Sequence, residues 1–67
     1  MLQVGSFYSE AGAALAYQQL VSAGFSAAWE HSHNAYRVLV VGIPAQNVYA
    51  TIYRLGTMGF RQIWVRE

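Results

Sequence analysis

The stretch Leu20-Val21-Ser22-Ala23-Gly24-Phe25 shares its leucine and its Gly-Phe pair with Leu55-Gly56-Thr57-Met58-Gly59-Phe60, 35 residues further along the chain. The same shift places Trp29 on Trp64, and Val4-Gly5 matches Val41-Gly42 at a shift of 37. Self-similarity of this kind indicates a repeated supersecondary unit. The 67 residues therefore form one small domain with two similar halves, at about residues 2–30 and 36–66.

Each half reads as strand, helix, strand. The first half predicts a strand at residues 2–7, a helix that begins after the N-cap Ser9 and ends at about Ala23, and a strand at residues 25–30. Gly24 follows that helix, where a left-handed cap favours glycine. The second half predicts a strand at residues 36–41, a helix with Val48, Ile52 and Leu55 on its apolar face, and a strand at residues 63–66.

The order βαββαβ predicts an α+β fold, a ferredoxin-like two-layer sandwich. In this fold a four-stranded antiparallel sheet carries both helices on one face and leaves the other face open. The usual strand order for the motif is 4-1-3-2, with strands one and three at the centre. We expect this central pair to be the only parallel neighbours in the sheet.

Strand alternation predicts which side chains lie on the open face. With Leu2 and Val4 toward the helices, Gln3 lies on the open face, and with Leu39 and Val41 inward, Tyr36, Val38 and Val40 lie outward. Ile63 and Val65 fit the core, which places Gln62, Trp64 and Arg66 outside. Trp29 fits either the core or the open face. Phe7, Tyr17, Phe25 and Phe60 are expected at core positions.

Ten aromatic side chains outnumber seven charged ones, and the net charge is only +1. A core of this size does not hold all ten aromatic rings, so some are expected on a binding surface. The low charge argues against strong binding to nucleic acid. No stretch approaches the ~20 apolar residues of a membrane span, so we expect no membrane contact by this segment. With no cysteine, disulfides and cysteine-based zinc sites are excluded.

The sequence gives little support for catalysis. The only carboxylates are Glu10, Glu30 and Glu67, and a pair that could flank a glycosidic bond is not expected among them. His31 and His33 are too few for a metal site and are expected in a polar hairpin loop at residues 31–34. We therefore expect no catalytic residue, no metal and no cofactor.

The chain resembles the SPOR (sporulation-related repeat) domain over residues 2–66. The resemblance rests on Leu2-Gln3-Val4-Gly5-Ser6-Phe7, on the two Gly-Phe repeats, and on Tyr36-Arg37-Val38 followed by Val41-Gly42. Family members often read Tyr-Arg-Val-Arg-Val-Gly in strand three, and this chain has one residue more. Either a bulge is present or Tyr36 lies one place earlier and faces the ligand, and we favour the second alternative. Leu39 and Val40 replace arginines, which makes the groove less basic.

The resemblance implies a non-catalytic module of the bacterial cell envelope (periplasm or cell wall) that binds septal peptidoglycan and prefers glycan strands without stem peptides. The implied parent protein is a cell-wall amidase or a lytic transglycosylase similar to rare lipoprotein A. The family pattern assigns glycan binding to Gln3, Ser6 and Tyr36, and to Trp64 on the last strand. The open-face prediction adds Trp29, Gln62 and Arg66. We expect a monomer. The alternative is a protein-interaction or homodimerisation domain that buries the open face, with Val38 and Val40 at its centre.

Overall fold

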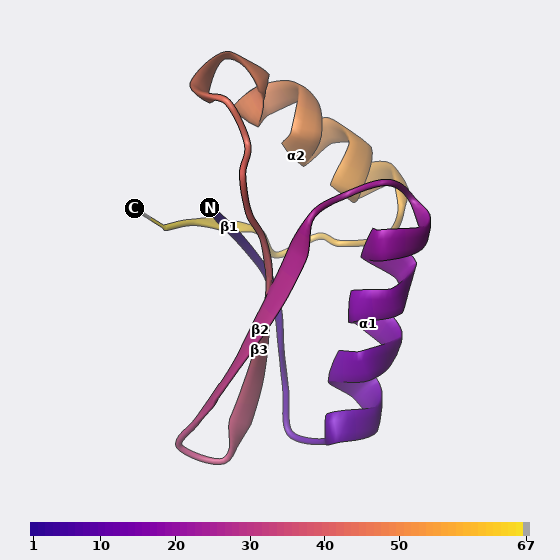
Figure 1. Cartoon of the computed structure of the whole chain (residues 1–67), viewed down its shortest axis with the longest axis vertical. Coiled ribbons are helices and arrows are strands. Elements are labelled where there is room, and N and C mark those ends of the chain that lie inside the picture. The colour runs from indigo at the N-terminus through magenta and orange to yellow at the C-terminus, as the bar shows by residue number, and fades with distance from the viewer. Residues whose placement is uncertain (67) are drawn as a thin grey trace.

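The computed structural model describes residues 1–66 and has the predicted α+β architecture (Figure 1). Its elements are β1 (Leu2–Phe7), α1 (Glu10–Ser22), β2 (Ala27–Ser32), β3 (Ala35–Val40), the short 3-10 helix η1 (Ala45–Asn47), α2 (Val48–Thr57) and β4 (Trp64–Val65). The four strands form one sheet in the order β2-β3-β1-β4. This is the predicted order 4-1-3-2 counted from the other edge.

All three strand pairings are antiparallel. The expectation of a parallel central pair is therefore wrong, because β1 and β3 run in opposite directions. The α1 connection places β1 and β2 parallel to each other, and β3 lies between them. Figure 1 shows α1 beside the sheet and α2 across one end of it.

One hydrophobic core joins the two helices to the sheet. Its fully buried members include Leu20 of α1, Leu55 of α2 and Leu2 of β1. The four aromatic residues predicted for the core pack around it and are partly buried: Phe7, Tyr17, Phe25 and Phe60. Leu20 and Leu55 are the repeat-related leucines, so the repeat marks the point where each helix enters the common core.

The two helices end in the same hydrogen-bonded turn. The backbone N–H of Phe25 donates to the carbonyl oxygen of Leu20, and that of Phe60 donates to Leu55, both at 3.0 Å. Gly24 and Gly59 have φ angles of +93° and +102°, a region in which a side chain on Cα is strained. The predicted cap at Gly24 is confirmed, and Gly59 is its counterpart in the repeat. At the other end of α1, Ser9 Oγ accepts a 3.1 Å hydrogen bond from the N–H of Gly12.

β3 is buried on both faces, and its predicted phase is wrong. Val38 and Val40 belong to the core cluster on the helix side, although they were expected on the open face. Leu39 was expected to face the helices. It lies between Val38 and Val40 on the same strand, so its side chain is on the opposite, open face. Tyr36 shares the phase of Val38 and therefore also lies on the helix side.

A β-bulge in β1 accompanies this arrangement. Gln3 pairs with Leu39 and Gly5 pairs with Val38, so Val4 is the extra residue. The bulge lies in β1 and not in strand three, and the favoured alternative of an outward-facing Tyr36 is not what the structure shows. A Cβ built on Gly5 would lie 2.7 Å from the ring of Phe7, so the strand packs closely on that ring.

The β2–β3 hairpin is longer than predicted. Its strands pair as far as Ser32 and Ala35, and only His33 and Asn34 form the turn. Their φ angles of 52° and 63° fit a two-residue turn with two left-handed positions. Within residues 1–66, neither helix has the length and apolar character needed to cross a bilayer.

Candidate functional site

A groove follows the edge of β1 on the side of the sheet where β4 is short. β4 pairs only with Leu2 and Gln3, so the backbone edge of β1 after Gln3 faces the segment that connects α2 to β4. The groove has a volume of about 390 Å³. It is lined by residues 3–6 of β1, by residues 59–62 of the connection and by Trp64.

The groove combines one large exposed aromatic ring with neutral hydrogen-bonding groups. Trp64 pairs with Gln3 across the β1–β4 ladder, and 68% of its surface is exposed. Ser6 contributes a hydroxyl and Gln62 a second amide to the lining. Arg61 is the one charged residue that lines the groove. Such a surface offers an apolar plate flanked by donors and acceptors.

Four of the predicted site residues therefore lie together: Gln3, Ser6, Gln62 and Trp64. Arg61 was missed by the sequence reasoning. The signal available was its position directly after the second Gly-Phe repeat, where the chain leaves the core before entering the last strand. Gly59 and Phe60 line the same groove.

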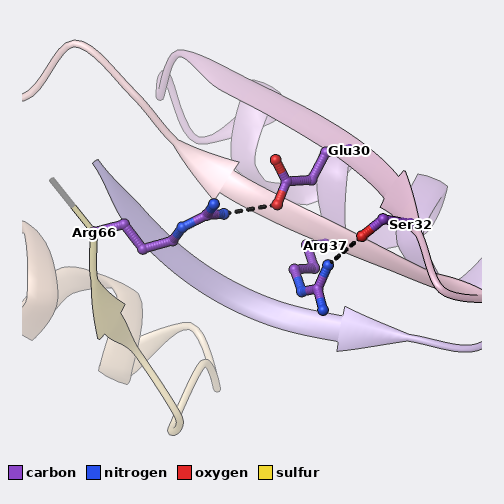
Figure 2. Close-up of polar contacts among 4 residues, drawn as sticks. All are labelled: Glu30, Ser32, Arg37 and Arg66. Atoms are coloured by element: carbon purple, nitrogen blue, oxygen red, sulfur yellow. Dashed lines mark hydrogen bonds and ion pairs between the residues drawn. The ribbon is translucent and has the colours of Figure 1, made fainter.

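The side chain of Arg66 forms an ion pair with Glu30 across the sheet. Its Nη1 atom lies 2.8 Å from Glu30 Oε1; the Arg66 side chain crosses β1 and meets the Glu30 side chain, which reaches over β3 from β2 (Figure 2). On the same face Arg37 Nη1 donates a 2.7 Å hydrogen bond to Ser32 Oγ. Arg66 was predicted to bind ligand, and the structure instead shows it bridging the two edge strands.

Tyr36 and Trp29 do not lie on the open face. Tyr36 pairs with His31 in the β2–β3 ladder and stacks on its ring, with centroids 4.1 Å apart and planes 5° apart. Trp29 lies diagonally across from Tyr36, with ring centroids 5.8 Å apart. Both rings face α1, so the prediction that Tyr36 joins Trp64 on the open face is wrong. Trp29 is half exposed and belongs neither to the buried core nor to the open face.

The centre of the open face is not an apolar patch. Val38 and Val40, which would have formed its centre, are buried beneath the helices. Leu39 lies at the centre of the open face instead, and it is only 5% exposed. The proposed basis for self-association through this face is thereby removed. Among residues 1–66, no three His, Asp or Glu side chains gather in a way that could hold a metal ion.

Comparison of the chain with protein-family models, with curated proteins and with solved structures gives no match.

Proposed function

We propose that this domain is a non-catalytic glycan-binding module, and that its ligand is a peptidoglycan strand stripped of stem peptides. The observation that carries the proposal is the pairing of Gln3 with Trp64 at the mouth of a groove lined by neutral polar groups. Sugar rings present CH groups to an aromatic face, while their hydroxyl and acetamido groups need hydrogen-bond partners beside it.

The size and lining of the groove support a sugar polymer as the ligand. Its volume of about 390 Å³ falls within the roughly 300–1,000 Å³ of typical ligand pockets. The groove follows an exposed strand edge, which suits an extended chain. Arg61 gives it a positive charge, and the preference for glycan without stem peptides is what the resemblance to SPOR domains implies.

A binding role fits the groove better than hydrolysis does. Glycosidases use two carboxyl groups on either side of the scissile bond, and no carboxylate is among the residues that line this groove. Glu30 is paired with Arg66, and Glu10 is at the start of α1 on the helix side of the sheet. Any chemistry on the glycan would therefore reside elsewhere in a parent protein.

The resemblance to SPOR domains supports the biological setting of the proposal. A module of this kind would carry its parent protein, an amidase or a lytic transglycosylase, to the division septum within the bacterial envelope. Gln3 and Ser6 fall on the family's polar positions and also line the groove. Tyr36 falls on a family position but lies outside the groove. The binding surface proposed here therefore depends on Trp64 as its aromatic residue.

Sedimentation with purified sacculi tests the proposal. Wild-type protein should co-sediment, and pretreatment of the sacculi with an amidase that removes stem peptides should increase the bound fraction. Trp64→Ala and Gln3→Ala should lower binding by about tenfold and about fivefold, since aromatic contacts contribute about 1 kcal/mol or more and a neutral hydrogen bond about 1 kcal/mol. Tyr49→Ala is the matched control, because Tyr49 is an exposed aromatic residue on α2, outside the groove.

Three results would overturn the proposal, the first two of them from the binding assay. One is binding that stays the same or falls after the stem peptides are removed. The other is equal binding by wild type, Trp64→Ala and Tyr49→Ala, all with the same thermal stability. A loss of stability on Trp64→Ala as large as that of Leu20→Ala would also contradict it, because Trp64 would then be a core residue.

A further inference from the structure

A second cavity lies on the helix side of the sheet, where α1 faces the β2–β3 hairpin. Its volume is about 120 Å³, and its walls are formed by Glu10 and Tyr17 of α1, Trp29 of β2 and Tyr36 of β3. Buried Ala13 also lines it. This cavity is separate from the groove at β1, which shares no residue with it.

Helix and strand periodicity bring these side chains together. Glu10, Ala13 and Tyr17 are three and seven residues apart, so they share one face of α1. Trp29 and Tyr36 are diagonal neighbours on adjacent strands, with ring planes inclined by 44°. The ring of His31 stacks on Tyr36, which fixes the orientation of the tyrosine. The small side chain of Ala13 leaves space between the rings.

The electrostatics of the cavity favour a cation. Glu10 is the one charged residue that lines it, and no ion pair of Glu10 is present within residues 1–66. Three of the four arginines have other contacts: Arg37 with Ser32, Arg54 over the ring of Phe25, and Arg66 with Glu30. Arg61 lines the β1 groove. Within residues 1–66, the carboxylate of Glu10 and the rings that line the cavity therefore have no arginine partner.

We propose that this cavity binds a methylated ammonium group, such as the trimethylammonium head of choline. Aromatic rings attract cations through their negative faces, and recognition of quaternary ammonium by several rings is a known use of this force. A cavity of roughly 150 Å³ holds one benzene molecule, so about 120 Å³ is of the size that suits a compact trimethylammonium group. An unmethylated ammonium is more strongly hydrated, which favours the methylated form.

Nuclear magnetic resonance of the intact chain tests this assignment, because its two tryptophans report on different sides of the sheet. Choline chloride is titrated against sodium chloride at equal ionic strength, and the two indole N–H signals are followed. The signal of Trp29 should shift and saturate at millimolar choline, while that of Trp64 stays in place. The uncharged isostere of choline, with carbon replacing the ammonium nitrogen, should bind about fivefold more weakly or not at all.

Glu10→Gln removes the charge without changing the shape of the side chain, and should weaken choline binding by about fivefold. Glu30→Gln is its control, since it changes the net charge equally but lies on the other face, and should leave binding unchanged.

Equal binding of choline and its isostere to wild type would overturn the proposal, and so would a Trp29 signal that does not move. The isostere comparison uses only wild-type protein and decides the question even if a variant does not fold. Sacculus binding depends on other residues, so either proposal can fail alone.

Discussion

Arg66 Nη1 and Glu30 Oε1 lie 2.8 Å apart and join opposite edges of the sheet across 36 residues of sequence. Leu39 lies between them in the sheet and is buried on a face that carries no helix. The ion pair crosses the two central strands on this same face of the sheet (Figure 2). The side chains of Arg66 and Glu30 remain 38% and 41% exposed.

This exposure sets the expected strength of the ion pair. Arg66→Gln and Glu30→Gln should each lower the free energy of unfolding by about 0.5 kcal/mol, because partly exposed pairs are screened by water and salt. Urea denaturation of both single variants and the double variant measures the coupling between the two residues. The coupling should shrink as sodium chloride is raised. A coupling of zero at low salt would contradict the assignment.

The ion pair also predicts a difference between two arginines in ligand binding. Arg61 lines the β1 groove, whereas Arg66 is held by Glu30. Arg61→Gln should therefore weaken sacculus binding by about threefold to tenfold through a lost hydrogen bond. Arg66→Gln should leave it within error of wild type. The opposite ranking in the sedimentation assay would show that Arg66 leaves Glu30 when the glycan binds.

The core predicts a large contrast between two leucines of α1. Leu20 is completely buried, while Leu15 is 59% exposed. Leu20→Ala should cost about 2–5 kcal/mol because it removes buried methyl groups and leaves a cavity. Leu15→Ala should change stability by less than about 0.5 kcal/mol. Chemical denaturation compares the two, and similar losses would mean that the helix buries a different face.

Two glycines of the second half should respond to alanine with opposite signs. Gly59 has a φ of +102°, so Gly59→Ala should cost about 1–2 kcal/mol in strain. Gly56 lies inside α2, and a Cβ there meets nothing within 4 Å. Gly56→Ala should stabilise the protein by about 0.5–1 kcal/mol through helix propensity. Thermal unfolding measures both, and a stabilising Gly59→Ala would contradict the left-handed cap.

The elements could be predicted because each one has a local signal in the sequence. Ser9 caps α1 and Gly24 ends it, and the repeat transfers the same end to Gly59. The phase of β3 could not be predicted from alternation. Val38, Leu39 and Val40 are all apolar and all buried, so this strand has no period of two. Leu39 is buried on the face that the Arg66–Glu30 ion pair crosses, and no local pattern predicts that pair.

The candidate site was predictable only in part, for a related reason. Gln3 could be placed because Leu2 and Val4 on either side of it are buried. Trp64 lies opposite Gln3 as predicted, but Val65, which was expected in the core, is 63% exposed. Tyr36 was misplaced together with β3. Trp29 could not be assigned, because its surroundings depend on Tyr17 and Glu10 of a helix that packs over the hairpin. An aromatic residue on an edge strand is ambiguous until the packing partner of that strand is known.

The two-residue turn at His33 and Asn34 has a kinetic consequence. It lets β2 and β3 meet through local contacts, which form early in folding because little chain entropy is lost. Glu30 belongs to that hairpin, but Arg66 follows β4, the last strand to be added to the sheet along the chain. Interactions made after the transition state change the unfolding rate and hardly affect the folding rate. Loss of the bridge between these residues is therefore expected to speed unfolding by about twofold, while changes at the turn are expected to slow folding.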